Sequence, residues 1–156
     1  MAAAADTKPI RSTVGSRDES GFLKNLRRGG FSPEKSFLEL IANSLDAKAS
    51  SIEFIRSDSD YTIKDNGWGM DKFGFEKMFC AQRENHLGEK TRGVSGYGSK
   101  PALLTLSNTS SVDIISYKDG IATKASVPWD RMFAESRYDD MITVDSPRQS
   151  TPDEPK

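Results

Sequence analysis

The sequence predicts a single α+β domain, and three features placed one after another along the chain carry that prediction. An amphipathic helix with a clear start signal comes first, short apolar strands and a second helix follow, and a hairpin with a strong turn signal closes the pattern. The chain has 156 residues, of which 35% are hydrophobic. That length suits one hydrophobic core and is too short for two large ones.

The two ends differ in composition from the centre. Residues 1–20 show no apolar periodicity, and residues 145–156 contain three prolines and no large apolar side chain. Segments of this kind bury too little apolar surface to offset the entropy of ordering them. We therefore expect disordered tails at residues 1–20 and 145–156, and a folded domain over residues 21–144.

The first predicted helix begins at Ser32 and Pro33, because a hydroxyl cap followed by proline at the first helical position is typical of a helix start. The helix is expected to end near residue 47 or 48. Its apolar side chains recur at helical spacing at Phe37, Leu38, Ile41 and Leu45.

Short strands are predicted at residues 52–55 and 61–64, and the second runs into Asp65-Asn-Gly67, a turn signal. A helix over residues 70–79 should follow. Residues 82–92 are polar and have no period, which favours a mobile loop.

The final elements follow a helix that should begin near Ser99. Strands at residues 112–117 and 121–127 flank Lys118-Asp-Gly120, a hairpin signal, and residues 141–144 suit a last strand. Helix, strands, helix and hairpin in this order give the α+β sandwich pattern.

Charge and cysteine content exclude several classes of protein. The 22 basic and 23 acidic residues leave a net charge of −1, so no overall field favours nucleic acid or an anionic membrane. The one cysteine, Cys80, can form neither an internal disulfide nor a thiolate metal site. The start lacks the features of a secretion signal, and no apolar run is long enough to span a membrane. An intracellular protein is expected.

The first motif with chemistry lies on the first helix. Glu39, Asn43 and Asp46 are spaced four and three residues apart, so their side chains share one face, opposite Phe37 and Leu45. This face is either the solvated side of an amphipathic helix or a group of hard oxygen ligands. In the second case the amide of Asn43 binds Mg²⁺ and the carboxylate of Glu39 orients or deprotonates a water molecule.

The second motif is the run from Asp65 to Met70. A carboxylate at a strand end is followed by Gly67 and Gly69, which allow the backbone to approach a flat ligand closely. A tight turn explains the glycines equally well. If the run lines a pocket, Asp65 can accept a hydrogen bond from an exocyclic amine, which favours adenine.

The third motif runs from Gly93 to Lys100. Three glycines lead into a helix start, where free backbone N–H groups bind anions and Lys100 adds a positive charge. The spacing fits neither the P-loop nor the dinucleotide-binding pattern. A flexible surface loop is the alternative interpretation.

Together the three motifs resemble those of the GHKL ATPase superfamily, which includes gyrase B, the heat-shock chaperone, MutL, histidine kinases and MORC proteins. The match extends over residues 30–127, and Gly96-Tyr-Gly98-Ser-Lys100 is most similar to the MORC branch. The resemblance implies a Bergerat-type two-layer α/β sandwich with helices on one face of a mixed sheet.

The resemblance also implies roles for individual residues. Glu39 corresponds to the water-activating glutamate, Asn43 to the Mg²⁺ ligand and Asp65 to the adenine-reading aspartate. Residues 82–92 would be a lid that folds over ATP. The remaining nucleotide-binding positions would be Asp46 as a supporting acid, Gly67, Gly69 and Met70 at the base, Gly93, Gly96, Tyr97, Gly98, Ser99 and Lys100 at the phosphates, and Thr123 behind the aspartate.

Two functions remain open from the sequence. The first is a Mg²⁺-dependent ATP-binding domain with weak ATP hydrolysis, in which ATP closes a lid and promotes self-association or binding of a larger protein partner. The second is a non-catalytic interaction module that keeps the fold. Nucleic acid is a partner that the net charge does not support, no membrane partner is expected, and the MORC resemblance implies a nuclear location.

Overall fold

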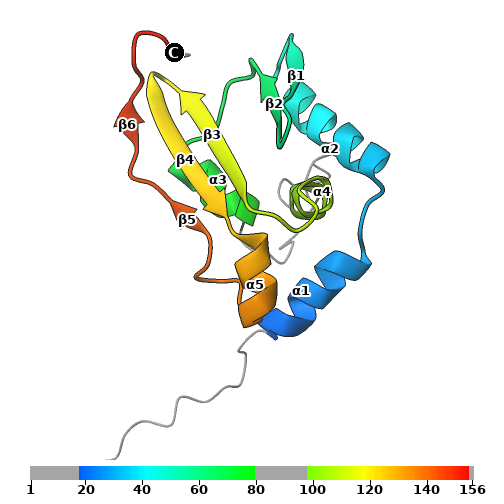
Figure 1. Ribbon diagram of the computed structural model, residues 1–156. Coiled ribbons are helices and arrows are strands. Elements are labelled where there is room, and N and C mark those ends of the chain that lie inside the picture. The colour runs from blue at the N-terminus through cyan, green and yellow to red at the C-terminus, as the bar shows by residue number, and fades with distance from the viewer. Residues whose placement is uncertain (1–17, 80–97, 155–156) are drawn as a thin grey trace, which may run out of the picture.

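The computed structural model describes residues 18–79 and 98–154, and its elements are α helices and short antiparallel strands (Figure 1). In chain order they are α1 Glu19–Arg28, α2 Pro33–Asp46, β1 Ile52–Arg56, β2 Tyr61–Asp65, α3 Lys72–Phe79, α4 Ser99–Leu106, β3 Val112–Lys118, β4 Ile121–Val127, α5 Trp129–Glu135, β5 Thr143–Val144 and β6 Arg148–Gln149. The α+β class is confirmed.

The start of α2 is the one that the sequence predicts. Ser32 caps the helix by accepting a hydrogen bond from the backbone N–H of Lys35 at 3.2 Å, and Pro33 occupies the first turn. The helix ends at Asp46, close to the expected residue. The side of α2 that is buried nevertheless differs from the prediction. Leu38 and Leu45, which the helical spacing placed on the apolar side, are 65% and 58% exposed, whereas Ser36 and Ser44 are buried.

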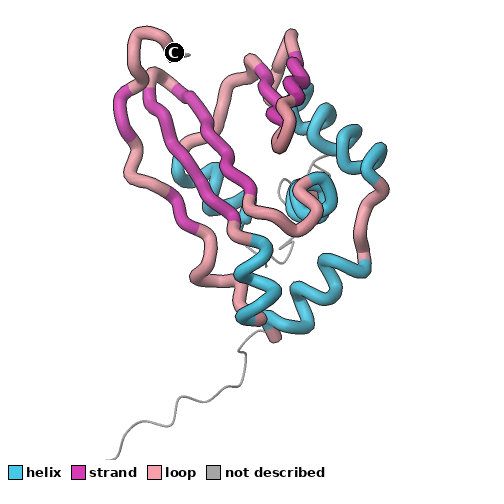
Figure 2. Tube along the Cα trace, in the orientation of Figure 1, coloured by secondary structure: helices cyan, strands magenta, loops and turns pink. Residues whose placement is uncertain are grey.

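The described strands form two separate sheets. β1 pairs with β2 in a hairpin, and β3 pairs along its whole length with β4, which also pairs with β5 and β6. Every one of these pairings is antiparallel, whereas a mixed sheet was expected. In Figure 2 the larger sheet lies on the left, and the β1-β2 hairpin lies apart from it at the upper right, above the helix α4.

The hydrophobic core lies where β4 meets the helices. Ala125 and Val127 of β4 are fully buried against aromatic residues of α3 and α5. The buried members of this cluster are Leu23, Phe75, Phe79, Leu104, Ala125, Val127, Trp129, Met132, Tyr138 and Met141. The core therefore joins α1, α3, α4 and α5 to one face of the larger sheet.

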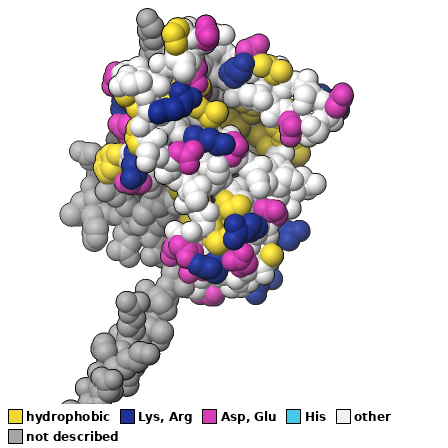
Figure 3. Space-filling view, turned by 60° about the vertical axis from the view of Figure 1, so that its left-hand side comes forward, with side chains coloured by type: hydrophobic (Ala, Val, Ile, Leu, Met, Phe, Trp, Pro, Cys, Tyr) yellow, Lys and Arg dark blue, Asp and Glu magenta, His cyan; other side chains and the backbone are white. Residues whose placement is uncertain are grey.

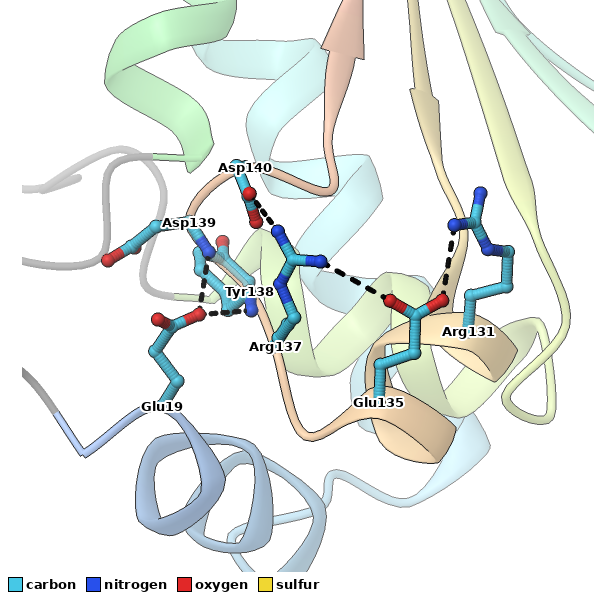
Figure 4. A network of polar contacts seen from close by, with 7 residues as sticks. All are labelled: Glu19, Arg131, Glu135, Arg137, Tyr138, Asp139 and Asp140. Carbon is cyan, nitrogen blue, oxygen red and sulfur yellow. Dashed lines mark hydrogen bonds and ion pairs between the residues drawn. The ribbon is translucent and has the colours of Figure 1, made fainter.

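Helix α1 is an element that the sequence analysis did not predict, since residues up to 20 were expected to be disordered. Asp18 caps it by accepting a hydrogen bond from the N–H of Gly21 at 2.8 Å. The Glu19 carboxylate accepts hydrogen bonds from the backbone N–H groups of Tyr138 and Asp139 (Figure 4). The Tyr138 hydroxyl in turn donates to the carbonyl oxygen of Phe79 at 2.8 Å, so α1 is tied to the core.

The C-terminal segment also differs from the predicted disordered tail. Arg148 and Gln149 of β6 lie opposite Ala122 and Ile121 of β4. Both nitrogens of the Arg148 fork contact the carboxylate of Glu154, at 2.6 and 2.7 Å. Residues 148–149 thus belong to the larger sheet, and composition alone did not reveal this because the pairing uses backbone groups.

Candidate functional site

Helix α2 presents Glu39 and Asn43 to the start of α4. The Nδ2 of Asn43 donates a hydrogen bond to the Oγ of Ser99 at 3.1 Å. The Glu39 carboxylate occupies the space that a side chain at Gly98 would need. Both side chains are half-buried. Two of the three residues on the polar face of α2 are therefore packed against α4, and the first and third sequence motifs meet there.

Asp65 is fixed to the same helix by a residue that the sequence analysis did not single out. Ser44 is 6% exposed, and its hydroxyl donates to Oδ2 of Asp65 at 2.9 Å. The backbone N–H of Gly67 donates to Oδ1 at 2.8 Å. Each carboxylate oxygen thus has a donor, so the orientation of the Asp65 side chain at the surface is set by its neighbours.

The loop after Asp65 is held on its first side by the end of α2. The N–H of Trp68 donates to the carbonyl oxygen of Ala47 at 3.0 Å. A Cβ added to Gly67 would lie 2.8 Å from both the Cβ and the carbonyl oxygen of Ala47. Gly67 is therefore required because its backbone lies against Ala47 at the end of α2, where no Cβ would fit. Turn geometry alone does not impose this requirement.

The second side of the loop is held by the end of β3. The N–H of Met70 donates to the Oγ of Ser116 at 2.6 Å, and the Lys118 ammonium contacts the Asp71 carboxylate at 2.9 Å. That hydrogen bond from Lys118 lowers the pKa of Asp71. Gly69 has a φ of +70°, and a side chain there would overlap the carbonyl oxygen of Tyr117.

Thr123 lies close to this loop. It is 2% exposed on β4, directly opposite Ser116 in the β3-β4 register. Directly opposite residues of an antiparallel pair share one face of the sheet. Thr123 is therefore a neighbour of the serine that holds Met70.

The remaining predicted site residues fall into two groups. Asp46 is exposed at the last position of α2, and Lys100 is buried in the first turn of α4 at 5% exposure. Gly93, Gly96 and Tyr97 lie outside the described residues, as does the predicted lid at residues 82–92.

Ser44 and Ser116 are the site residues that sequence reasoning missed. Ser44 follows Asn43 of the first motif, and Ser116 lies within the predicted strand at residues 112–117. Both serines are buried, at positions where an apolar residue is usual. A buried hydroxyl needs a hydrogen-bond partner, so a serine on the apolar side of a helix is a usable signal. Ser44 falls on that side of α2 together with Ser36.

The residues present suit a magnesium ion that is held mainly by other ligands. Because the Asn43 amide uses its Nδ2 toward Ser99, its Oδ1 is the atom available to a cation. Among residues 18–79 and 98–154 there is no group of three or more His, Cys, Asp or Glu side chains that could enclose a metal. Mg²⁺ tolerates such a site because it retains waters and takes oxygens from phosphates.

The surface charges show no single sign on the side that Figure 3 displays. Acidic and basic side chains are interspersed over the described part of this face, and neither forms a continuous area. This agrees with the net charge of −1.

In the part of the chain that the structure describes, no helix is long and apolar enough to cross a membrane.

Glu39 and Asn43 of α2 thus meet the glycine-preceded start of α4, and Ser44 of the same helix holds Asp65. The sequence profile of the histidine kinase-, DNA gyrase B- and HSP90-like ATPases matches residues 31–153, and the chain belongs to this family. No individual curated protein gave a match. The predicted family is thereby confirmed, whereas the proposed closeness to MORC proteins stays a prediction.

Proposed function

We propose that the chain is a Mg²⁺-dependent ATP-binding domain that hydrolyses ATP slowly. The observation that carries the proposal is that one helix, α2, contacts both the start of α4 and the Asp65 carboxylate. Glu39 and Asn43 contact the start of α4, while Ser44 of the same helix holds Asp65. Family membership independently supports ATP as the ligand.

The adenine end is assigned to Asp65 and the loop that follows it. Ser44 and the Gly67 amide fix the carboxylate, which can then accept a hydrogen bond from the exocyclic amine of adenine. A charge-assisted hydrogen bond contributes about 1.5–3 kcal/mol, which corresponds to roughly tenfold or more in affinity. Guanine, which carries a carbonyl at that position, would be disfavoured.

The phosphate end is assigned to the start of α4. The helix has Gly98 at its N-cap, and glycine carries no side chain that could cap the first N–H groups, so these donors suit phosphate oxygens. Asn43 would hold the magnesium ion through Oδ1, and the ion would neutralise phosphate charge. Glu39 would accept a proton from the water that attacks the terminal phosphorus, releasing ADP and phosphate.

The test is calorimetric titration with a non-hydrolysable ATP analogue and Mg²⁺. Asp65→Asn should weaken binding at least tenfold. Asp113→Asn, which changes a carboxylate on β3 away from the loop, should leave binding unchanged. Absence of binding by folded wild-type protein would reject the proposal.

Hydrolysis is tested separately by phosphate release. Glu39→Gln should abolish release while binding of the analogue persists, and Glu34→Gln, an exposed position on the same helix, should behave as wild type. Binding without release in the wild-type protein would leave a nucleotide-binding module that is not an enzyme.

A non-catalytic role in association is the second candidate, and one observation favours it. Large apolar side chains are exposed on the outer side of α2 and on the neighbouring β1-β2 hairpin, with Leu38 at 65%, Leu45 at 58% and Phe54 at 51%. Light scattering with and without the analogue tests whether this face mediates self-association. Leu38→Ser with Leu45→Ser should then reduce the measured mass without affecting binding of the nucleotide.

A further inference from the structure

The tip of the β3-β4 hairpin is held from outside by the C-terminal segment. Gln149 and Arg148 pair with Ile121 and Ala122, and the N–H of Ser150 donates to the carbonyl oxygen of Gly120 at 2.9 Å. The segment therefore follows β4 to the turn and passes beyond it.

Glu154 is the centre of a polar cluster at that tip. Its carboxylate contacts both nitrogens of the Arg148 fork and accepts a hydrogen bond from the Thr151 N–H at 2.9 Å. It also accepts one from the Tyr117 hydroxyl at 3.0 Å. Its side chain is 21% exposed, less than half the exposure of Arg148. Surface ion pairs generally contribute little. A bidentate arginine–carboxylate pair whose carboxylate also accepts other hydrogen bonds is the exception, because its geometry keeps both side chains in place.

The same stretch of β3 holds the loop assigned to adenine. Ser116 accepts from the Met70 amide, the Tyr117 carbonyl lies against Gly69, and Lys118 pairs with Asp71. Three consecutive residues of β3 thus contact the loop. The middle one, Tyr117, does so through its backbone carbonyl, and its side-chain hydroxyl reaches Glu154.

We propose that residues 148–154 form a C-terminal clip, which fixes the β3-β4 tip and through it positions the Gly69–Asp71 loop for the nucleotide base. Tyr117, Arg148 and Glu154 act as positioning residues that touch no nucleotide. The inference rests on the proposed function for its effect on ATP, but its effect on the loop is independent of any ligand.

The first test follows hydrogen exchange at the loop in the nucleotide-free protein. Glu154→Gln weakens the pairing with Arg148, and Tyr117→Phe removes only the hydroxyl. Each should raise the exchange rate of the Met70 amide about three- to tenfold, because its acceptor sits on the loosened strand. The Trp68 amide, which bonds to α2, should change less.

The matched control is Asp113→Asn, which breaks the 2.8 Å ion pair between Asp113 and Lys124 at the other end of the same hairpin. It should leave exchange at Met70 unchanged. If Glu154→Gln and Tyr117→Phe lower the melting temperature but alter Met70 exchange no more than this control does, the clip has no positioning role and the inference is overturned.

The second test measures affinity for the ATP analogue. Both variants should weaken binding about three- to tenfold, and the double variant should be no weaker than Glu154→Gln, since the two changes break one chain of contacts. Unchanged affinity in both variants would overturn the link to the nucleotide. If the wild-type protein does not bind the analogue, the proposed function fails, while the exchange experiment still decides whether the clip positions the loop.

Discussion

Gly69 illustrates how one residue can be fixed by two separate requirements. Its φ of +70° lies in the left-handed region, and an added Cβ would overlap the backbone carbonyl of Tyr117. Gly120, with a φ of +73°, meets only the first requirement, because nothing lies within 4 Å of its Cβ position. Comparing substitutions at Gly69 and Gly120 therefore distinguishes the cost of backbone strain from the cost of steric overlap.

Gly120→Ala should lower the free energy of unfolding by about 1 kcal/mol, the usual cost of a left-handed alanine. Gly69→Ala should lower it by about 2–4 kcal/mol, because overpacking against a backbone that cannot move adds to that cost. Urea denaturation of both variants measures the difference. Equal losses would mean that the loop moves away from β3 freely.

Gly98 gives a different expectation, since its neighbour is the end of a flexible side chain. A methyl group there meets the Glu39 carboxylate, which can rotate away at little energetic cost. Gly98→Ala should therefore fold normally but displace the proposed general base. We expect phosphate release to fall at least tenfold, as for a loss of general-base catalysis, while the affinity for the ATP analogue changes little. A parallel loss of both would indicate damage to the phosphate site itself.

At the scale of elements, α1 is connected to the core by polar contacts as well as by its buried Leu23. Glu19 accepts two backbone N–H groups in the turn after α5, and the Phe22 ring packs edge-on against Tyr138 with centroids 4.8 Å apart. The same turn carries an exposed ion pair between Arg137 and Asp140 (Figure 4). These two kinds of contact should differ in strength.

Glu19→Ala should destabilise the fold by about 1–3 kcal/mol, because two backbone donors lose a charged acceptor. Asp140→Ala should cost at most about 1 kcal/mol, since its ion pair is solvent-exposed. Thermal or urea denaturation compares them. If the two variants lose equal stability, the contact with α1 is no stronger than an ordinary surface pair.

Elements with their own local signals were predictable from the sequence. The Ser32 cap and Pro33 fixed the start of α2, and Lys118-Asp-Gly120 predicted the β3-β4 hairpin. α1 and β6 were missed because their stability comes from distant partners, Tyr138 for the first and β4 for the second. Local propensity and periodicity do not predict contacts with residues that are distant in the sequence.

The candidate site shows the same division. Glu39, Asn43 and Asp65 were predicted from residue type and spacing, but Ser44 and Ser116 were not, because serine is common throughout most sequences. Their roles depend on contacts across 21 residues to Asp65 and across 46 residues to Met70. The outward position of Leu45 was also missed, because helical periodicity alone does not say which side of a helix the rest of the fold covers.

For the whole molecule, acid should weaken the attachment of the C-terminal segment. The Arg148 guanidinium holds the pKa of Glu154 well below its ordinary value of 4.5. A carboxyl with a lowered pKa in the folded state contributes stability above its unfolded pKa, and the contribution is lost as pH falls below that value. The contribution of this pair should therefore be complete at neutral pH and decline below about pH 4.5.

Glu154→Gln should reduce the loss of stability between pH 5 and pH 3 relative to the wild type. The measurement is the free energy of unfolding from urea titrations at several pH values. Asp153→Asn removes a neighbouring carboxylate without touching the Arg148 fork and should keep the wild-type slope. A wild-type slope in Glu154→Gln as well would show that the fork does not contribute to acid sensitivity.

Ligand binding should act on the stability of the whole domain, because the site draws on α2, α4, β2 and β3 together. A ligand that binds only the folded state at one hundred times its Kd stabilises by about 2.7 kcal/mol. For a chain of this size that corresponds to a rise in melting temperature on the order of 10 °C.

The ATP analogue with Mg²⁺ should give this rise, and removal of Mg²⁺ by chelation should abolish most of it. Asn43→Ala should resemble the chelated wild type even when Mg²⁺ is present, since its Oδ1 is the proposed protein ligand. A rise that persists after chelation and in Asn43→Ala would mean that the nucleotide binds without the metal, and the assignment of Asn43 would then be wrong.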